Sequence, residues 1–288
     1  MKGEDKGGSW KVEAATLRIA NCDLFLIMNL FLSGKNALVC GSTQGIGLAI
    51  AKELALLGAS CTLMARNEKT LAHAVTSLST HLGQQHGYLV ADFSDRAAVE
   101  QAIQKHIADT TVHILINNTG GPPAGPITDA SPEIFLLYFE QHIAVNQVLA
   151  VACLDGMKVA GYGRIINVIS TSVRIPIDNL GVSNTIRGAT ASWAKTWSNE
   201  VAQFGITVNN VLPGFTKTER LNALIQNIAA RKGVEAVSVA EQMAAEVPAR
   251  RFGEADEIAA YVAFLATPAA AYINGTSVPV DGGRTGAI

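Results

Sequence analysis

Short apolar runs alternate along the chain with segments of helical spacing, from Lys35 onward. The apolar runs are rich in Val, Ile and Leu, as in strands that are buried on both faces. They cover residues 36–40, 60–65, 87–91, 112–116, 164–169 and 206–212. After the first run, apolar positions fall on one helix face: Ile46, Ile50, Leu54 and Leu57. Buried strands joined by helices predict a single α/β domain, a doubly wound parallel sheet with helices on both faces.

Composition excludes several classes of function. The chain has 288 residues, 49% of them hydrophobic and 16% charged, with a formal net charge of -2, so it lacks the basic surface of a nucleic-acid-binding protein. The longest apolar run, residues 24–32, is much shorter than a membrane span. The four cysteines are scattered without metal-ligand or disulfide spacing. We therefore expect a cytoplasmic protein with no metal, no nucleic-acid partner and no membrane partner.

Residues 1–27 precede the alternating pattern. No small-residue cleavage site follows their apolar end, so a signal peptide is not expected. We interpret them as a flexible N-terminal extension or an upstream translated segment, with Met28 as the original start. The folded domain is then expected over residues 28–288.

A glycine-rich turn follows the first apolar run and opens the first helical segment. Its sequence is CGSTQGIG, which places Gly41, Gly45 and Gly47 where the backbone must turn tightly. The absence of side chains lets a diphosphate approach the backbone, and the start of the helix supplies free N–H groups. We predict that this turn binds a dinucleotide through Gly41, Ser42, Thr43, Gln44, Gly45, Ile46 and Gly47.

The motifs that follow occur in a recognisable order: ADF (91–93), NNTG (117–120), PGFTKT (213–218), ARRFGEADEIA (249–259) and VPVDGG (278–283). With the G-x-x-x-G-x-G turn, they make the chain similar to the short-chain dehydrogenase/reductase family from about Lys35 to Gly283. The resemblance implies a Rossmann-type NAD(P)-binding domain with a lid at about 215–250. It also implies further cofactor contacts at Asp92, Phe93, Asn118, Thr119, Gly120, Pro213, Gly214, Thr216 and Thr218.

The cofactor choice depends on the residue after the second strand. A carboxylate there binds the ribose 2′-OH of NAD, whereas an arginine accommodates the 2′-phosphate of NADP. Arg66 stands at this place, so we favour NADP. NAD remains the alternative, because Arg66 could be a solvated turn residue and Glu68 offers a carboxylate nearby.

The resemblance also implies a catalytic set of asparagine, serine, tyrosine and lysine. Asn146 and Ser170 match the first two, but the count from Ser170 places Ser183 and Arg187 where the family has tyrosine and lysine. A serine hydroxyl is a far weaker acid than a tyrosine, and arginine does not relay a proton by losing one. Arg187 can still hold the nicotinamide ribose and stabilise a developing alkoxide.

Three interpretations follow. Ser183 and Arg187, with a water ordered by Asn146, pass the proton in an altered relay. Alternatively, His142 supplies it, since it lies four residues before Asn146 on the same helical face and its unperturbed pKa suits the task. Or the chain binds NADP without redox chemistry, in a sensing or structural role. We favour the first, an oxidoreductase acting on a small carbonyl or alcohol substrate.

Substrate and assembly are less defined. Leu221, Leu224, Ile225 and Ile228 form an apolar lid face that indicates an acyl-type substrate, for which 3-oxoacyl-carrier-protein reductase is the nearest activity by resemblance; core packing explains them equally well. Family members form homotetramers or homodimers through two long helices, here about 132–158 and 184–204, and the C-terminal strand. Trp193 and Trp197 on the second of these helices are interface or core aromatics.

Overall fold

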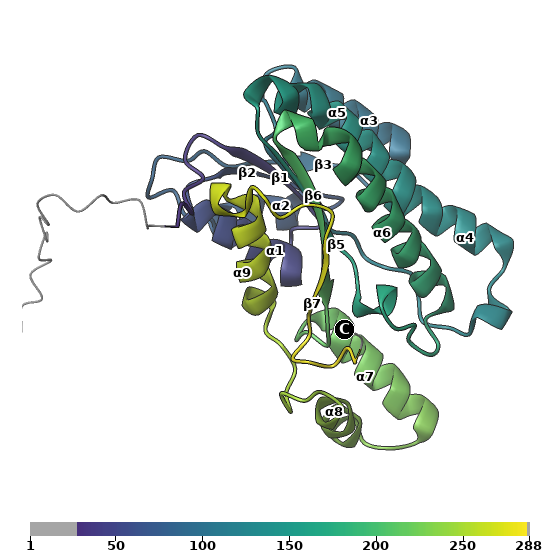
Figure 1. The fold of residues 1–288 in the computed structure, drawn as a ribbon. Helices are drawn as coiled ribbons and strands as arrows, with labels where there is room; N and C mark the ends of the chain where they lie inside the picture. Colours follow the sequence, from purple (N-terminus) through teal and green to yellow (C-terminus); the bar gives the residue numbers. More distant parts are fainter. Residues whose placement is uncertain (1–27, 287–288) are drawn as a thin grey trace, which may run out of the picture.

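The computed structural model describes residues 28–286; the predicted N-terminal extension lies outside the described residues. Seven strands form one parallel sheet in the order β3-β2-β1-β4-β5-β6-β7, which confirms the predicted doubly wound fold (Figure 1). The strands are β1 (Asn36–Cys40), β2 (Ser60–Ala65), β3 (Gly87–Val90), β4 (Ile114–Asn117), β5 (Gly163–Val168), β6 (Ile206–Pro213) and β7 (Ser277–Val280). The strand order reverses between β1 and β4, and ligands of such sheets bind at the carboxyl ends beside this point.

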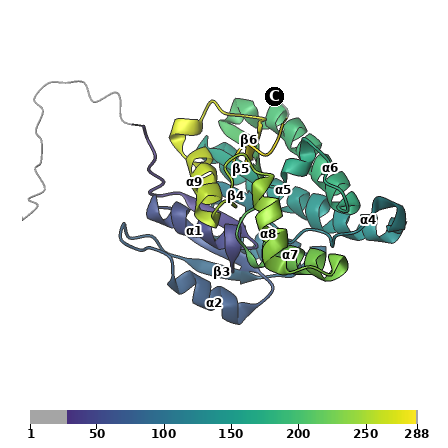
Figure 2. The same ribbon diagram turned by 90° about the horizontal axis from the view of Figure 1, so that it is seen from below.

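Helices cover both faces of the sheet (Figures 1 and 2). On one face lie α1 (Gly45–Leu56), α2 (Glu68–Thr76) and α9 (Ala255–Ala266). On the other lie α3 (Arg96–Ile107), α5 (Val145–Ala160) and α6 (Gly181–Val201). The remaining helical elements are α4 (Pro132–Phe139), the π turn η2 (Glu140–Ala144), the short η1 (Ile127–Asp129), η3 (Thr171–Val173), η4 (Ala202–Phe204) and η5 (Pro268–Ala270), and α7 (Glu219–Lys232) and α8 (Ala236–Ala245).

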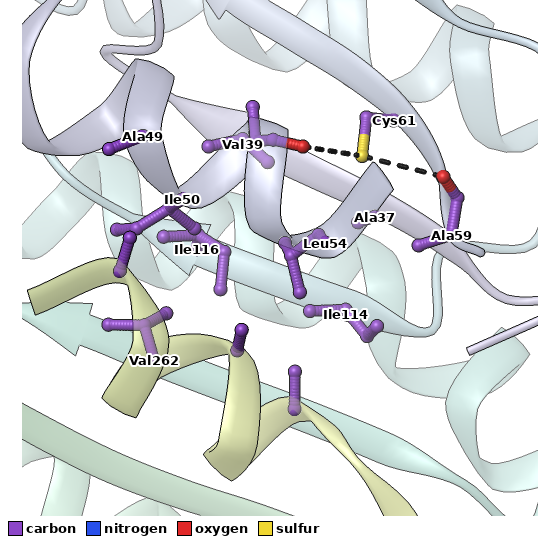
Figure 3. Close-up of a cluster of buried hydrophobic side chains, with 14 of the residues drawn as sticks. Ala37, Val39, Ala49, Ile50, Leu54, Ala59, Cys61, Ile114, Ile116 and Val262 are labelled. Atoms are coloured by element: carbon purple, nitrogen blue, oxygen red, sulfur yellow. Dashed lines mark hydrogen bonds between the residues drawn. The ribbon is translucent and has the colours of Figure 1, made fainter. Parts of the chain in front are cut away.

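The central strands are buried on both faces because their side chains alternate between two cores. Val39 of β1 and Ile116 of β4 point toward α1 and α9, where Ile50, Leu54 and Val262 meet them (Figure 3). Burying each such side chain contributes roughly 1.5–3 kcal/mol. The apolar runs of the sequence therefore give both the strands and the layer order.

A row of polar side chains crosses four neighbouring strands of the sheet, from the last residue of β4 to the first residue of β7. Asn117 Nδ2 donates to Asn167 Oδ1 (2.8 Å), Asn167 Nδ2 to Asn210 Oδ1 (2.9 Å), and Asn210 Nδ2 to Ser277 Oγ (3.0 Å). The four residues are in register across β4, β5, β6 and β7. Since buried amides must be hydrogen-bonded, this ladder fixes the relative positions of the strands.

Helices α7 and α8 have a small core of their own. The α7 face of Leu221 and Ile225 packs against Val239 and Met243 of α8. The apolar lid face predicted from sequence therefore has a partner within the α7–α8 unit, as the core-packing interpretation proposed.

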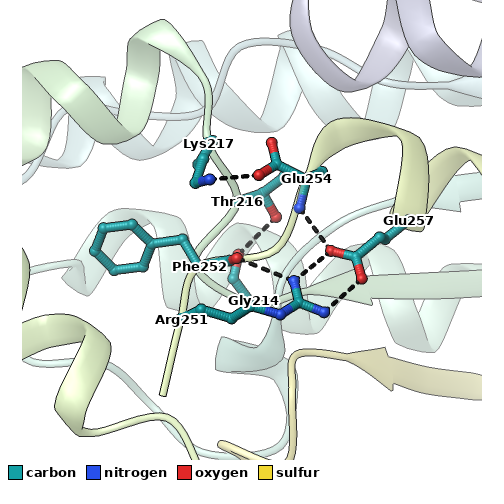
Figure 4. Close-up of polar contacts among 7 residues, drawn as sticks. All are labelled: Gly214, Thr216, Lys217, Arg251, Phe252, Glu254 and Glu257. Carbon is teal, nitrogen blue, oxygen red and sulfur yellow. Dashed lines mark hydrogen bonds and ion pairs between the residues drawn. The ribbon is translucent and has the colours of Figure 1, made fainter. Parts of the chain in front are cut away.

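Two paired backbone segments connect the α7–α8 unit to the rest of the domain, and Figure 4 shows the polar contacts of residues in them. Lys217 N donates to Gly253 O (2.8 Å), and Gly253 N donates to Phe215 O (2.9 Å). Arg251 makes a bidentate ion pair with Glu257 (2.6 and 2.7 Å), which lowers the pKa of that carboxyl to about 2. Both ends of the unit are thus tied at one place.

One continuous helix, Pro132–Ala160, has the length and mean hydropathy (1.4) that a membrane span requires, and 39% of its most apolar window is buried. Its second half packs Val145, Leu149 and Cys153 into the core beside the sheet. Core packing therefore accounts for much of its apolar character.

Candidate active site

The glycine turn between β1 and α1 leaves no room for side chains. Gly41 and Gly45 have positive φ values of 57° and 54°. A Cβ on Gly47 would lie 2.2 Å from the carbonyl oxygen of Gly41, and one on Gly41 would lie 2.3 Å from that of Asn118. Asn118 Nδ2 donates to the carbonyl oxygens of Cys40 (3.3 Å) and Gly41 (3.1 Å). The turn is therefore a backbone structure held by one amide.

The same turn presents unused hydrogen-bonding groups. Gln44, the N-cap of α1, makes no side-chain capping bond, so the first N–H groups of the helix are available. Ser42 Oγ is buried and has no partner. Free donors at a helix start fit a diphosphate, so the turn fits a dinucleotide. Thr43 and Ile46 are half-buried beside it.

Further predicted cofactor residues follow β2 and β3, at the same edge of the sheet as the glycine turn. Arg66 is exposed after β2, and Asp92 after β3 accepts from Ser94 N (2.9 Å) and Ser94 Oγ (2.8 Å). These bonds, and then the charge of Arg66, hold the pKa of Asp92 below its usual value. The following Phe93 is half-buried against the core.

Glu68, the alternative carboxylate for a ribose, is already engaged. It accepts from the Tyr88 hydroxyl (3.3 Å), which raises the pKa of Tyr88.

The PGFTKT segment follows β6 and adjoins the glycine turn. Thr218 caps α7 by accepting from Leu221 N (3.4 Å), and its Cγ2 would lie 3.3 Å from a Cβ on Gly45. Thr216 is buried and donates to Gly214 O (3.1 Å), and Pro213 ends β6. Thr119 and Gly120 follow β4 from the neighbouring strand end. The predicted contacts of the cofactor therefore line the carboxyl ends of the strands.

Ser170 lies just after β5 and caps η3. Its Oγ accepts from Ser172 N (3.1 Å), so its own hydroxyl hydrogen is free to be donated. Thr171 and Ser172 of η3 are buried, and η3 packs against α6. Ser170 therefore occupies a fixed position beside the first turns of α6.

Ser183 and Arg187 lie one turn apart on α6, and only 5% and 7% of their surfaces are exposed. Arg187 Nη1 donates to the carbonyl oxygen of Val168 (3.1 Å), two residues before Ser170. Burial, and then the charge of Arg220, lower the pKa of Arg187 to about 10, so it stays charged at neutral pH. Asn146, also buried, begins α5 immediately after the π turn.

The π turn changes the role expected of His142. This residue is 2% exposed, and its Nδ1 bonds Thr119 Oγ1 (2.9 Å). Burial, and then the charge of Arg187, lower the pKa of His142 to about 3. The expectation of an ordinary pKa is therefore wrong, because the imidazole is desolvated beside a cation. At neutral pH His142 does not carry the proton that a cationic donor needs.

Sequence reasoning missed Arg220, in the first turn of α7. Its guanidinium donates to the carbonyl oxygens of Gly121 and Pro122, both at 3.2 Å. It thereby joins the α7–α8 unit to the loop after β4. The only signal was a cation two residues after Thr218, at the start of the predicted lid.

The two tryptophans of α6 share one acceptor on α5. Trp193 and Trp197 donate from Nε1 to Gln147 Oε1 at 2.7 and 2.9 Å, and both are half-buried against the core. They contribute to packing between the two helices.

Comparisons with known proteins agree with this architecture. The family model described as enoyl-(acyl carrier protein) reductase matches residues 41–285. A 3-oxoacyl-(acyl-carrier-protein) reductase, FabG of Haemophilus influenzae, is 34% identical over 258 residues, covering 88% of this chain and 98% of the relative. The NADPH-dependent reductase BacG of Bacillus subtilis is 31% identical over 263 residues, covering 88% and 98%.

Solved structures show the same fold. L-sorbose reductase from Gluconobacter frateurii, complexed with NADPH and L-sorbose, has a TM-score of 0.85 at 29% identity, over 91% of this chain and 100% of that chain. YwfH, an NADPH-dependent reductase involved in bacilysin biosynthesis, has a TM-score of 0.84 at 30% identity, over 89% and 100%. With its dinucleotide-type turn and its matching strand order, the chain belongs to the short-chain dehydrogenase/reductase family.

Proposed function

We propose that this chain transfers a hydride between NADP(H) and a carbonyl or alcohol substrate, with Ser183, Arg187 and an ordered water in place of the family's tyrosine and lysine. The observation that carries the proposal is the meeting of β5 and α6. The guanidinium of Arg187 is fixed at the end of β5 beside Ser170, whose hydroxyl hydrogen is free. A cation and a hydroxyl donor beside one oxygen are what carbonyl reduction requires.

The bound cofactor would supply the hydride, and the protein must position the substrate and handle the proton. Ser170 donates a hydrogen bond to the substrate oxygen. Arg187 stabilises the negative charge that develops on that oxygen. Ser183, one helical turn away, connects the oxygen to a water held by the amide of Asn146.

Magnitudes favour a slow enzyme over an inactive one. A positioned general acid contributes roughly 10²–10⁴ in rate, whereas orientation of the reactants contributes roughly 7–11 kcal/mol. Loss of the tyrosine removes only the smaller contribution.

NADP is favoured over NAD by the charges after β2 and β3. Arg66 is exposed and suits a 2′-phosphate, while Glu68 is bonded to Tyr88. The relatives and neighbours named above include NADPH-dependent reductases. A 3-oxoacyl substrate, as for the FabG relative, is a finer possibility that the α7 face does not support, because that face packs on α8.

A nucleotide-binding protein without turnover is the second candidate. It is favoured by the low pKa of His142, which leaves no cationic proton donor besides the two arginines among the site residues described.

NADPH oxidation on a panel of 3-oxoacyl, quinone and small ketone substrates separates the two. We expect slow turnover by the natural chain and faster turnover by the Ser183→Tyr/Arg187→Lys double variant. Thr185→Tyr, on the exposed side of α6, controls for adding a ring to this helix. Activity in the double variant alone would favour the second candidate. Absence of NADP(H) binding in every variant would refute both.

We also propose a homotetramer or homodimer, assembled through the two long helices at about 132–158 and 184–204 and through the C-terminal strand. Apolar residues exposed on the first of these helices, among them Leu136 (70% exposed) and Phe139 (47%), support this.

A further inference from the structure

Two guanidinium groups from different helices meet over one glycine. A Cβ built on Gly121 would lie 2.9 Å from Arg187 Nη2 and equally 2.9 Å from Arg220 Nη2. Arg187 comes from α6 and Arg220 from α7, and both reach Gly121 in the loop after β4. The glycine is what allows both cations to approach the same point.

No carboxylate neutralises this pair within residues 28–286. The ion pairs there involve other cations, and the strongest charge acting on Arg187 is that of Arg220, which lowers its pKa. Arg187 Nε is buried and has no hydrogen-bond acceptor. A buried guanidinium with an unpartnered donor and a second cation beside it is costly without a counter-charge, so the arrangement favours an anion.

The position of the arginine pair indicates that it serves the substrate and not the diphosphate of the cofactor. Arg187 lies one helical turn after Ser183. Its guanidinium is bonded to the carbonyl oxygen of Val168, two residues before Ser170, so it lies where we expect the substrate oxygen. Arg220 has an exposed surface and only backbone carbonyl partners, which leaves donors for a ligand. A diphosphate, by contrast, already has the glycine turn and the start of α1.

We propose that Arg187 and Arg220 together bind a carboxylate of the substrate, so that the substrate is a small oxo acid or hydroxy acid and not a neutral thioester. This inference rests on the proposed function. Planar guanidinium groups bind carboxylates through paired, charge-assisted hydrogen bonds, which gives orientation as well as affinity. Arg220, carried on the α7–α8 unit, would then select the substrate's charge while Arg187 also serves the reacting oxygen.

The test compares oxo acids with their primary amides, which have the same shape without the charge. Pyruvate, acetoacetate and levulinate place the carboxylate at increasing distance from the carbonyl. We expect the natural chain to prefer at least one acid over its amide. Arg220→Met should raise KM for that acid about tenfold to a hundredfold, as expected for a lost charged hydrogen bond, and leave KM for the amide within about twofold.

Two further variants make the result specific. Arg220→Lys keeps the positive charge but loses the paired donors of the guanidinium, so it should keep part of the affinity for the acid. Arg231→Met removes an exposed cation near the other end of α7 and should change neither substrate. Equal losses on acid and amide would show that Arg220 only holds the loop, and would overturn the proposal.

An NADPH titration tests whether the arginine pair binds a phosphate of the cofactor instead of a carboxylate of the substrate. If Arg220→Met weakens NADPH binding and spares the acid-to-amide preference, the pair binds a cofactor phosphate and the proposal is wrong. If no variant turns over any substrate, the proposed function fails, but the carboxylate site is still tested by thermal stability. Acetoacetate, but not acetoacetamide, should then raise the melting temperature of the NADP⁺-loaded natural chain and not that of Arg220→Met.

Discussion

The two ends of the active site are built from different parts of the chain: one from backbone and the other from side chains. At the cofactor end, the cradle is backbone: Gly41 and Gly47 approach each other and Asn118 so closely that any side chain would collide. At the end where we propose that the proton is handled, side chains form the site: Ser183 and Arg187 of α6 and Asn146 of α5. A backbone cradle tolerates no change, whereas a side-chain site changes residue by residue on a constant fold. The difference would allow the family's cofactor site to accompany the altered proton relay that we propose.

The largest effect is expected at the backbone end. Gly47→Ala places a Cβ 2.2 Å from Gly41 O and 2.7 Å from Asn118 Nδ2, so the turn must open. We expect NADPH affinity, measured by fluorescence titration, to fall by more than about a hundredfold, together with about 1–3 kcal/mol of unfolding free energy. Gly87→Ala is the control, because nothing lies within 4 Å of its Cβ. Tight NADPH binding by Gly47→Ala would show that the turn is not the cradle.

A smaller effect is expected at the side-chain end. Ser183→Ala should lower kcat about tenfold to a hundredfold, near the lower range for a positioned proton donor, and leave NADPH affinity within about twofold. Stopped-flow kinetics in H₂O and D₂O should show a reduced solvent isotope effect on the fast step. Thr185→Ala, on the exposed side of α6, should behave as the natural chain. An unchanged kcat in Ser183→Ala would mean that water reaches the substrate oxygen without the serine.

The smallest effect concerns stability. In the unfolded chain His142 has its ordinary pKa of 6.5, whereas in the folded chain its pKa is about 3. Between these values, lowering the pH therefore favours the unfolded state, by up to about 1.4 kcal/mol per pH unit for one group. Denaturant unfolding of His142→Gln, which retains an acceptor for Thr119, should show a shallower loss of stability from pH 7 to pH 5.

His106 and His113 contribute in the same direction, because burial lowers both pKa values. The difference between the natural chain and His142→Gln isolates His142. Equal slopes would mean that His142 is already solvated in the folded chain.

Sequence alone predicted the sheet well because its central strands are buried. The predicted bounds of β1 and β2 coincide with the structure, since apolar side chains end where the chain turns. The bounds of β4 and β5 moved by one or two residues, because hydrogen bonds to neighbouring strands, which the sequence does not show, set them. Ser277–Val280 is half-exposed and contains Pro279, so only the resemblance indicated a C-terminal strand.

The side-chain end was less predictable. Residues 132–158 read as one regular helix, which would place His142 and Asn146 on one face. Whether a helix widens into a π turn depends on its packing, and here the turn accompanies a bond from His142 to Thr119. Arg220 was missed because its partners, the carbonyls of Gly121 and Pro122, are distant in sequence.

The asparagine ladder affects the rigidity of the sheet. Asn117, Asn167 and Asn210 join neighbouring strands through side-chain hydrogen bonds, and a shift of one strand would leave a buried donor unsatisfied. We therefore expect this part of the sheet to be rigid. Substrate entry and product release are then expected to depend on the α7–α8 unit, which Arg220 joins to the loop after β4.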